Sequence, residues 1–240
     1  MKATVRSMLV VTVLLGSSFA VRGAENSANS AANVLTEAEK AAGWKLLFDG
    51  KTLNGWHSFK RAEAPKQGWI IEGDWLKCVA NGHGGDLVSR DEFNDFELSW
   101  EWRIPPKGNN GVKYFITEDR TQAIGHEYQM IDDAVVQNPK YTTASFYDVL
   151  PPKSDKPLKP PGETTHSRVV VQGNHVEHWL NGDRVLAYEL GSEEVMAGVA
   201  KSKFKNVPGF GTKIKGHILL TEHHDEASFR NLKIRELPGL

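Results

Sequence analysis

Residues 93 to 104 have the sequence FNDFELSWEWRI, in which large apolar side chains recur at every second position. Phe96, Leu98, Trp100 and Trp102 alternate with polar and charged residues. This period is typical of a β-strand with one face in a core and the other in water. Two prolines follow directly and end the run. We therefore predict a long antiparallel strand over residues 93–104.

Segments with strand character recur along most of the chain, and two-residue turn signals such as Asn181-Gly182 separate several of them. Helical character is confined to a capping box that opens at Thr36 and to residues 192–204. Many short strands with little helix indicate an all-β fold, an antiparallel jelly-roll β-sandwich. The further strands are expected at residues 44–48, 69–72, 75–80, 111–117, 126–131, 143–149, 168–172, 175–180, 184–190, 216–222 and 229–237.

Length and charge limit the class of protein. The chain has 240 residues, a common length for one all-β domain, and a formal net charge of -1. A nucleic-acid-binding protein would show a basic excess, so we expect no nucleic-acid partner. The seven Trp suit either a core or a surface on which sugar rings stack.

The N-terminus has the features of an export signal. Lys2 and Arg6 precede a short apolar run at residues 8–16, and small residues follow to Ala24. We predict a signal peptide at residues 1–24, a flexible spacer with a short helix at 25–42 and one jelly-roll domain at 43–240. The protein is then periplasmic or secreted, with no membrane anchor after cleavage. Cys78 is the single cysteine, which excludes an internal disulfide.

Three groups of residues could carry chemistry. Glu127 and Gln129 share one face of a strand, where a carboxylate beside an amide could act as a base with an orienting partner, or could simply face solvent. Glu97 and Glu101 also share a face, either as an acid pair or as a salt-bridge ladder. The run 222–225 (EHHD) offers histidines, but adjacent strand residues point to opposite faces, so local spacing does not indicate a metal site.

Six stretches of the sequence, taken together in chain order, resemble the 3-keto-disaccharide hydrolase family, whose members have concanavalin A-like jelly-roll folds. They are GWKLLFDGKTLNGW (43–56), GDLVSRDEFNDFELSWEWR (85–103), GNNGVKYF (108–115), EYQMID (127–132), HWLNG (178–182) and FRNLKI (229–234). Thr221-Glu222-His223 stands where the family pattern has an amide, an acid and a histidine.

The resemblance implies an enzyme that cleaves 3-keto-glycosides by C2 proton abstraction, elimination and hydration. It implies that Glu127 and His223 are the catalytic base and acid, in either order. A lysine, an amide or a bound divalent cation would polarise the ketone, and no other cofactor is expected. The implied partners are a small carbohydrate and a sugar 3-dehydrogenase that makes the keto sugar. The expected substrate-binding residues are Glu97, Glu101, Asn110, Lys113, Gln129, Tyr147, His178 and Asn181.

Two other functions fit the same residues. A laminarinase-like retaining glycosidase has acids at positions i, i+2 and i+5 of one strand, where this chain has Glu127, Gln129 and Asp132. A non-catalytic carbohydrate-binding module would use tryptophan and asparagine without proton transfer. His178 also has a structural alternative, as a hydrogen-bonded histidine of the core.

Overall fold

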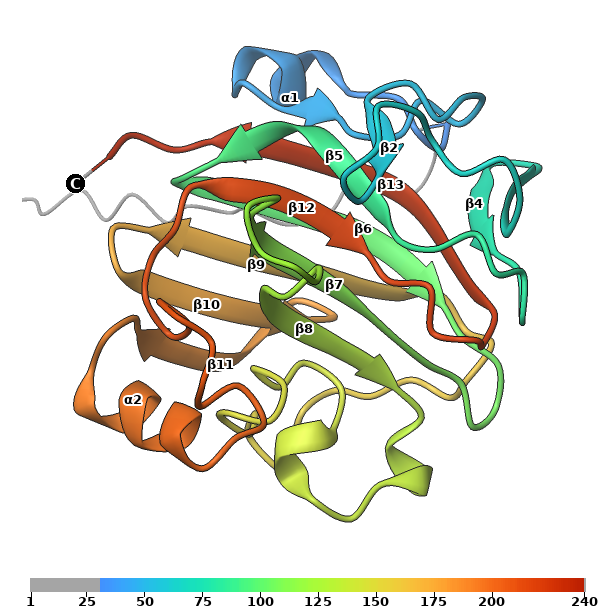
Figure 1. Cartoon of the computed structure of the whole chain (residues 1–240). Helices are drawn as coiled ribbons and strands as arrows, with labels where there is room; N and C mark the ends of the chain where they lie inside the picture. Colours follow the sequence, from blue (N-terminus) through green and yellow to red (C-terminus); the bar gives the residue numbers. More distant parts are fainter. Residues whose placement is uncertain (1–30, 240) are drawn as a thin grey trace, which may run out of the picture. The chain divides into compact units, whose positions relative to one another are not determined.

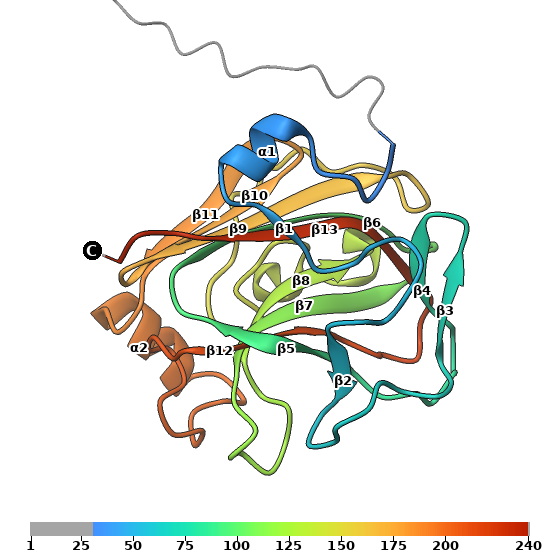
Figure 2. The ribbon, with the colours of Figure 1, turned by 90° about the horizontal axis from the view of Figure 1, so that it is seen from above.

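The computed structural model describes residues 31–239, which form two antiparallel β-sheets packed face to face (Figure 1). Sheet A has eight strands in the order β11-β10-β9-β6-β13-β4-β3, with β1 also paired to β13. Sheet B has five, in the order β2-β5-β12-β7-β8. Figure 2, seen from above, separates β9, β6 and β13 of sheet A from β5 and β12 of sheet B. The predicted all-β jelly-roll sandwich is confirmed.

The chain passes between the two sheets several times. Sheet A contains β1 (Lys45–Leu46), β3 (Trp69–Glu72), β4 (Trp75–Cys78), β6 (Phe96–Arg103), β9 (Thr165–Gln172), β10 (His175–Leu180), β11 (Asp183–Glu189) and β13 (Ala227–Glu236). Sheet B contains β2 (Trp56–Ser58), β5 (Leu87–Phe93), β7 (Asn109–Ile116), β8 (His126–Ile131) and β12 (Gly216–Leu220). The helices are α1 (Glu37–Ala41), α2 (Glu193–Ala200) and the 3-10 turns η1 (Asp133–Val135) and η2 (Pro139–Tyr141).

Strand β6 has the predicted alternation, since Phe96, Leu98 and Trp100 are fully buried between the sheets. The predicted start of this strand was wrong. The chain finishes β5 of sheet B at Phe93, turns, and enters sheet A at Phe96. The turn is fixed by the Asp95 carboxylate, which accepts the Gly173 N–H at 2.6 Å and pairs with the Lys213 ammonium.

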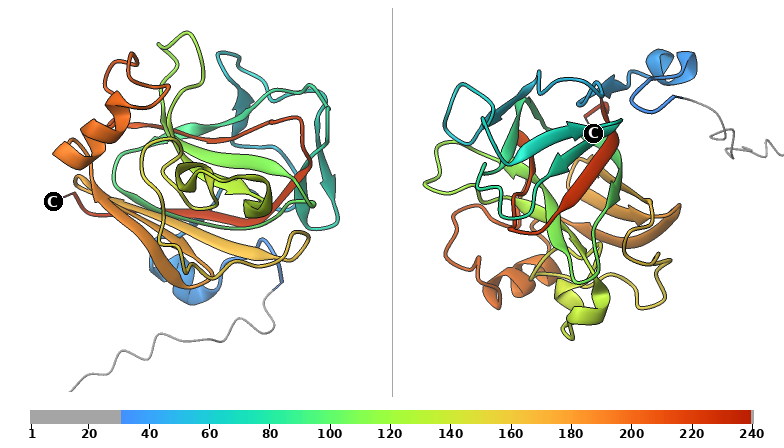
Figure 3. Two further views of the ribbon diagram at one scale, coloured as in Figure 1. Left: turned by 90° about the horizontal axis from the view of Figure 1, so that it is seen from below. Right: turned by 90° about the vertical axis from the view of Figure 1, so that its right-hand side faces the viewer.

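Strand β13, the last of the chain, lies inside sheet A. It pairs with β6 on one side, and on the other side it pairs with β4 near its start and with β1 near its end. The right-hand view of Figure 3 shows the teal strands β3 and β4 beside the red β13. Segments far apart in the sequence therefore meet at this strand.

Two sequence predictions need correction. Residues 143–149 form no strand, because Ala144 and Asp148 have φ angles of 68° and 64°, and only isolated bridges through Phe146 remain. Strands β2 and β5 were not predicted. The capping box is present as expected, with Thr36 and Glu39 each bonding the other's backbone N–H.

A chain of hydrogen bonds crosses the core between the sheets. His178 is fully buried, with Nδ1 2.9 Å from the Ala144 carbonyl and Nε2 2.9 Å from the Tyr114 hydroxyl. A carbonyl only accepts, so Nδ1 carries the proton and Nε2 accepts from Tyr114. Tyr188 then donates to the Tyr114 oxygen at 2.5 Å. The network ties β10, β11, β7 and the 143–147 segment into one unit.

The predicted leader at residues 1–24 lies outside the described residues. Between residues 31 and 239, no helix has the length and apolar character needed to cross a membrane. Cys78 is buried in the core, and burial raises the pKa of its thiol to about 12, so the thiol is chemically inert in the folded chain.

Two buried histidines should make the fold sensitive to acid. Burial lowers the pKa of His126 to about 3 and that of His178 to about 4, below the value of about 6.5 in an unfolded chain. Below pH 6.5 the unfolded state binds protons that the folded state does not, so stability is complete above that pH and falls as pH drops. We expect each histidine to contribute up to about 1.4 kcal/mol per pH unit.

Urea unfolding of the wild type and of His126→Phe between about pH 7 and 5 measures this slope. The free energy of unfolding of the variant should depend less steeply on pH, and the difference in slope should equal the contribution of one histidine. Carboxylate effects are common to both proteins, so they cancel in this comparison. Equal slopes would contradict the assignment.

Candidate active site

Polar side chains are buried on the outer face of sheet B, the face turned away from sheet A. All six residues of β8 are buried, including Glu127 and Gln129, although alternation turns these two away from the core. Buried polar groups outside a core require a specific reason, because desolvation is costly. Lys113 lies opposite Glu127, and Gly111 lies opposite Gln129, in the neighbouring strand β7.

Gly111 gives Glu127 its position. A Cβ atom built at residue 111 would lie 2.2 Å from Oε1 of Glu127 and 2.9 Å from its Cδ. The carboxylate of Glu127 therefore lies directly over the Gly111 backbone. On the other side of Gly111 is the start of the 221–225 segment, since the Thr221 N–H donates to the Gly111 carbonyl at 3.1 Å. Glu127 thus reaches across β7 toward the residues that follow β12.

Burial raises the pKa of Glu127 above the ordinary carboxyl value. The positive charges of Lys113, Lys203 and His223 act in the opposite direction, and the Asp86 carboxylate adds to the rise. A carboxylate with a raised pKa holds a proton more readily than an ordinary one, which suits it to proton transfer.

Gln129 and His223 are linked through Asn109. The Gln129 amide donates to Asn109 Oδ1 at 3.1 Å, and Asn109 Nδ2 lies 3.3 Å from Nδ1 of the His223 ring. The Asn109 backbone N–H donates to Asp225 at 3.0 Å, which fixes the segment that carries His223. His223 is exposed at the rim of this group, whereas Glu127 lies at its floor.

Two buried polar atoms of the 221–225 segment lack a partner within the described residues. They are Oγ1 of Thr221 and Oε1 of Glu222. The Glu222 backbone N–H donates to Asp86 at 2.8 Å, so the two acids lie close together, and burial raises the pKa of Asp86. Unsatisfied buried polar atoms beside a raised-pKa carboxylate are typical of a site that binds a polar ligand.

Tyr147 and Lys203 border Glu127 from the other direction. The Tyr147 N–H donates to the Glu127 carbonyl at 3.1 Å, and the Lys203 ammonium lies 4.5 Å from the centre of the Tyr147 ring. The Lys203 backbone N–H is held by Asp148 at 2.7 Å. Burial, followed by the charge of Glu127, raises the pKa of Tyr147 to about 12, so its hydroxyl stays protonated.

The structure thus brings together Glu127, Gln129, Lys113, Tyr147 and His223 of the predicted set. Among residues 31–239, no three His, Cys, Asp or Glu side chains are arranged to hold a metal ion.

Five predicted substrate-binding residues lie elsewhere, and three of them have structural roles in or beside the core and turns. Asn110 points to the core side of β7, where it donates to the Thr221 carbonyl at 2.9 Å and accepts the Gly111 N–H. His178 belongs to the core network. Asn181, in the β10–β11 turn, accepts the His166 N–H at 3.0 Å and donates to the Pro157 carbonyl at 2.7 Å.

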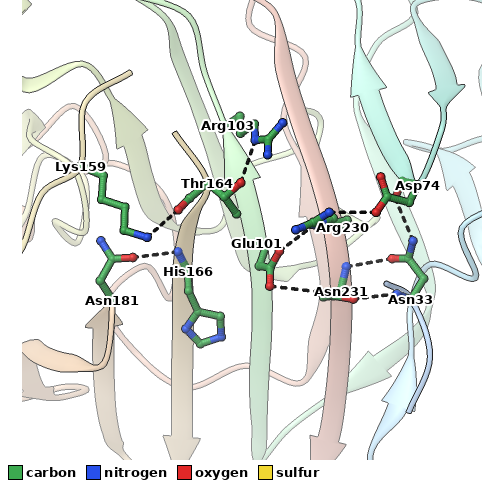
Figure 4. A network of polar contacts seen from close by, with 10 residues as sticks. All are labelled: Asn33, Asp74, Glu101, Arg103, Lys159, Thr164, His166, Asn181, Arg230 and Asn231. Atoms are coloured by element: carbon green, nitrogen blue, oxygen red, sulfur yellow. Dashed lines mark hydrogen bonds and ion pairs between the residues drawn. The ribbon is translucent and has the colours of Figure 1, made fainter. Parts of the chain in front are cut away.

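Glu97 and Glu101 lie on the outer face of sheet A, away from the Glu127 group. Glu97 bonds Arg168 at 2.7 Å and Arg235 at 2.8 Å. Figure 4 shows that the Glu101 carboxylate accepts hydrogen bonds from Arg230 and Asn231. Asn231 in turn accepts the backbone N–H of Asn33 in the N-terminal segment. This arrangement matches the salt-bridge ladder considered from the sequence.

The predicted catalytic and substrate-binding set did not include Asn109, Asp86, Glu222 and Lys203, although the run 222–225 was considered from the sequence. Strand alternation could have found Asn109, which shares a face with Gly111 and Lys113, whereas Asn110 faces the core. Lys203 comes from the loop after α2 and has no local signal, because only the tertiary fold brings it beside Tyr147.

Known proteins with the same fold and sequence pattern act on sugars or are described as doing so. The chain is 29% identical over 263 residues to the 3-keto-disaccharide hydrolase of Bacteroides thetaiotaomicron, with 89% of each chain covered. A candidate glycosyl hydrolase from Parabacteroides distasonis aligns with a TM-score of 0.78 and 31% identity over 87% of this chain and all of its own. A second from that organism has a TM-score of 0.65 and 27% identity, with 81% of this chain and 99% of that one covered.

Fold, site and relatives together define a hydrolase that acts on sugars. Residues 43–235 match the model of the 3-keto-alpha-glucoside-1,2-lyase-like domain. The chain belongs to this family.

Gly111→Ala should displace the Glu127 carboxylate and leave the fold intact, because the added methyl meets only a side chain. Misplacement by about 1 Å can reduce turnover by about 10²-fold. Steady-state kinetics with a thermal-unfolding control measure both effects. The double variant with Glu127→Gln should be no slower than Glu127→Gln alone, and additive losses would contradict a role through Glu127.

Glu97→Gln should lower the free energy of unfolding by about 2 kcal/mol, because two arginines lose a charged partner. Turnover should stay unchanged, since Glu97 lies on the opposite sheet from Glu127. Denaturant unfolding and kinetics on one preparation test this, and a selective loss of turnover would return Glu97 to the substrate site.

Proposed function

We propose that this exported enzyme hydrolyses 3-keto-glycosides by elimination followed by hydration. The observation that carries the proposal is the buried Glu127 carboxylate, whose pKa is raised and which lies opposite Lys113 and within reach of the charge of His223. Export rests on the leader at residues 1–24, and mass spectrometry of the mature protein would detect cleavage after Ala20 or Ala24.

Glu127 is the base in the first step. A ketone at C3 acidifies the C2–H bond of the sugar, and the carboxylate takes that proton. The C2–H electron pair forms the C1–C2 double bond, the C1–O bond breaks, and its electrons stay on the glycosidic oxygen. His223, at the exposed rim, gives the leaving oxygen its proton, which releases an alcohol or a second sugar.

Negative charge builds up on the C3 oxygen as the C2 proton leaves. Lys113 and Lys203 are the two ammonium groups whose charges reach Glu127, and they would stabilise this oxyanion. Gln129 and Glu222 would bind sugar hydroxyls. The unpartnered Oε1 of Glu222 is an acceptor suited to this role.

Hydration reverses the proton transfers. Water adds through oxygen to C1, His223 takes its proton, and Glu127 returns a proton to C2. The net reaction is glycoside plus water to a free 3-keto sugar plus an alcohol. The substrate must first be oxidised at C3, so a sugar 3-dehydrogenase would supply it, and GxGxxG is absent from this sequence.

Direct retaining hydrolysis fits the residues less well. The laminarinase-like arrangement would pair Glu127 with Asp132, and Asp132 uses both of its oxygens to accept the N–H groups of Ala134 and Lys107. A binding module without turnover would give no reason for a buried carboxylate with a raised pKa beside two lysines.

The test compares a 3-keto-glucoside with its unoxidised parent, with and without a chelator, in deuterated water. We expect cleavage of the keto sugar alone, with deuterium incorporated at C2. Glu127→Gln should reduce both cleavage and exchange by about 10²-fold or more, because general-base catalysis contributes roughly that factor. His223→Gln should slow cleavage more than exchange.

Cleavage of the parent glycoside without C2 exchange would move the assignment to direct hydrolysis. Sugar binding without any turnover would leave a carbohydrate-binding module.

A further inference from the structure

A hollow lies on the outer face of sheet B, away from the Glu127 group. It has a volume of about 510 Å³. Its walls come from β2 and the loop that follows it, from β5, from the start of β12, and from Glu118, which lies two residues after β7. Its lining residues are His57, Lys60, Arg61, Ala62, Arg90, Glu118 and His217. This volume lies within the range of small-molecule sites.

The charges around this hollow do not balance. Lys60, Arg61 and Arg90 face a single carboxylate, that of Glu118, within the lining set. None of the three cations forms an ion pair with any residue between 31 and 239, whereas Arg230 of sheet A is paired with both Asp74 and Glu101. Arg90 makes one neutral contact, from Nη2 to the Ala62 carbonyl at 2.7 Å. Three free cations around one concavity attract an anion.

Two imidazoles form the floor. His57 is buried, and its Nδ1 lies 2.9 Å from the carbonyls of both Ser58 and Arg61. Those carbonyls only accept, so Nδ1 carries the proton. The His217 ring meets the His57 ring edge-on, with centroids 5.9 Å apart. Nδ1 of His217 is buried and has no partner within the described residues, which is costly unless a ligand binds it.

We propose that this hollow binds a small organic anion through its phosphate or sulfate group. The oxyanion would accept from the guanidinium of Arg90 and from the ammonium of Lys60, beside the ring of His217. Charge-assisted bonds of this kind are about twice as strong as neutral ones, and guanidinium groups match tetrahedral oxyanions well. The remaining volume holds the body of the ligand.

This site is independent of the Glu127 group. His217 stands near the start of β12, whereas Glu222 and His223 follow its end, about five residues or roughly 17 Å along the chain. Between them, Val88, Ile116 and Leu219 form a fully buried apolar cluster. A ligand in the hollow would not contact Glu127, so Glu127→Gln should bind it as the wild type does.

Isothermal titration of the mature chain at constant ionic strength tests the proposal. Glucose 6-phosphate and glucose 6-sulfate are titrated against glucose, with inorganic phosphate as competitor. We expect binding of the two anionic sugars only, with competition by phosphate. Arg90→Gln should weaken binding by about tenfold, the equivalent of roughly 1.4 kcal/mol. Arg103→Gln, which removes the same charge from sheet A, is the matched control.

Lys60→Gln is a second variant that should not disturb the fold, because the Lys60 ammonium makes no hydrogen bond within the described residues. It should weaken binding several-fold and leave the melting temperature unchanged. The proposal is overturned if glucose binds as tightly as its phosphate, if Arg103→Gln weakens binding as much as Arg90→Gln, or if no anionic sugar binds at millimolar concentration. Competition by inorganic phosphate, if complete, would identify the oxyanion as the recognised group.

Discussion

The arrangement of this molecule depends on one buried hydrogen bond, from Nδ1 of His178 to the Ala144 carbonyl. Strand β8 is the last strand of sheet B, and the segment after η2 covers its free edge, without being a regular strand itself. The imidazole reaches this segment from the opposite sheet and holds it from inside the core. Because Ala144 is held there, Tyr147 lies against Glu127, so a core histidine determines the wall of a surface site.

The site follows from two departures from ordinary strand chemistry. Gly111 leaves a gap on the outer face of β7, and the Glu127 carboxylate fills it. Loops then cover that face, which removes water from Glu127 and raises its pKa. The positive charges of Lys113 and Lys203 favour the ionised form of Glu127 and oppose this rise in its pKa. The two opposing effects suit the carboxylate to taking and releasing a proton.

Alternation in the sequence predicted the sandwich, because the core-facing residues of β6 and β8 follow period two without interruption. The pairing of Glu127 with Lys113 could not be predicted, since register between strands has no local signal. Strand β5 was missed because its first three residues are all buried, and so it shows no alternation. Residues 143–149 resemble a strand in composition, but two left-handed residues bend them. His178 and Asn181 match motif positions, yet the sequence cannot distinguish a residue that touches substrate from one that holds the segments around the site.

Strand β13 is made last and lies in the interior of sheet A, where it pairs with β6, β4 and β1. Asn231 of β13 and Asn33 each donate a backbone N–H to the side-chain oxygen of the other, although they are 198 residues apart in the sequence. The larger sheet therefore cannot close before β13 is present, and its folding depends on contacts of very long sequence separation, which form slowly. Until β13 is in place, the edges of β6, β4 and β1 that face it have no partner, and unpaired strand edges make a partly folded chain prone to aggregation.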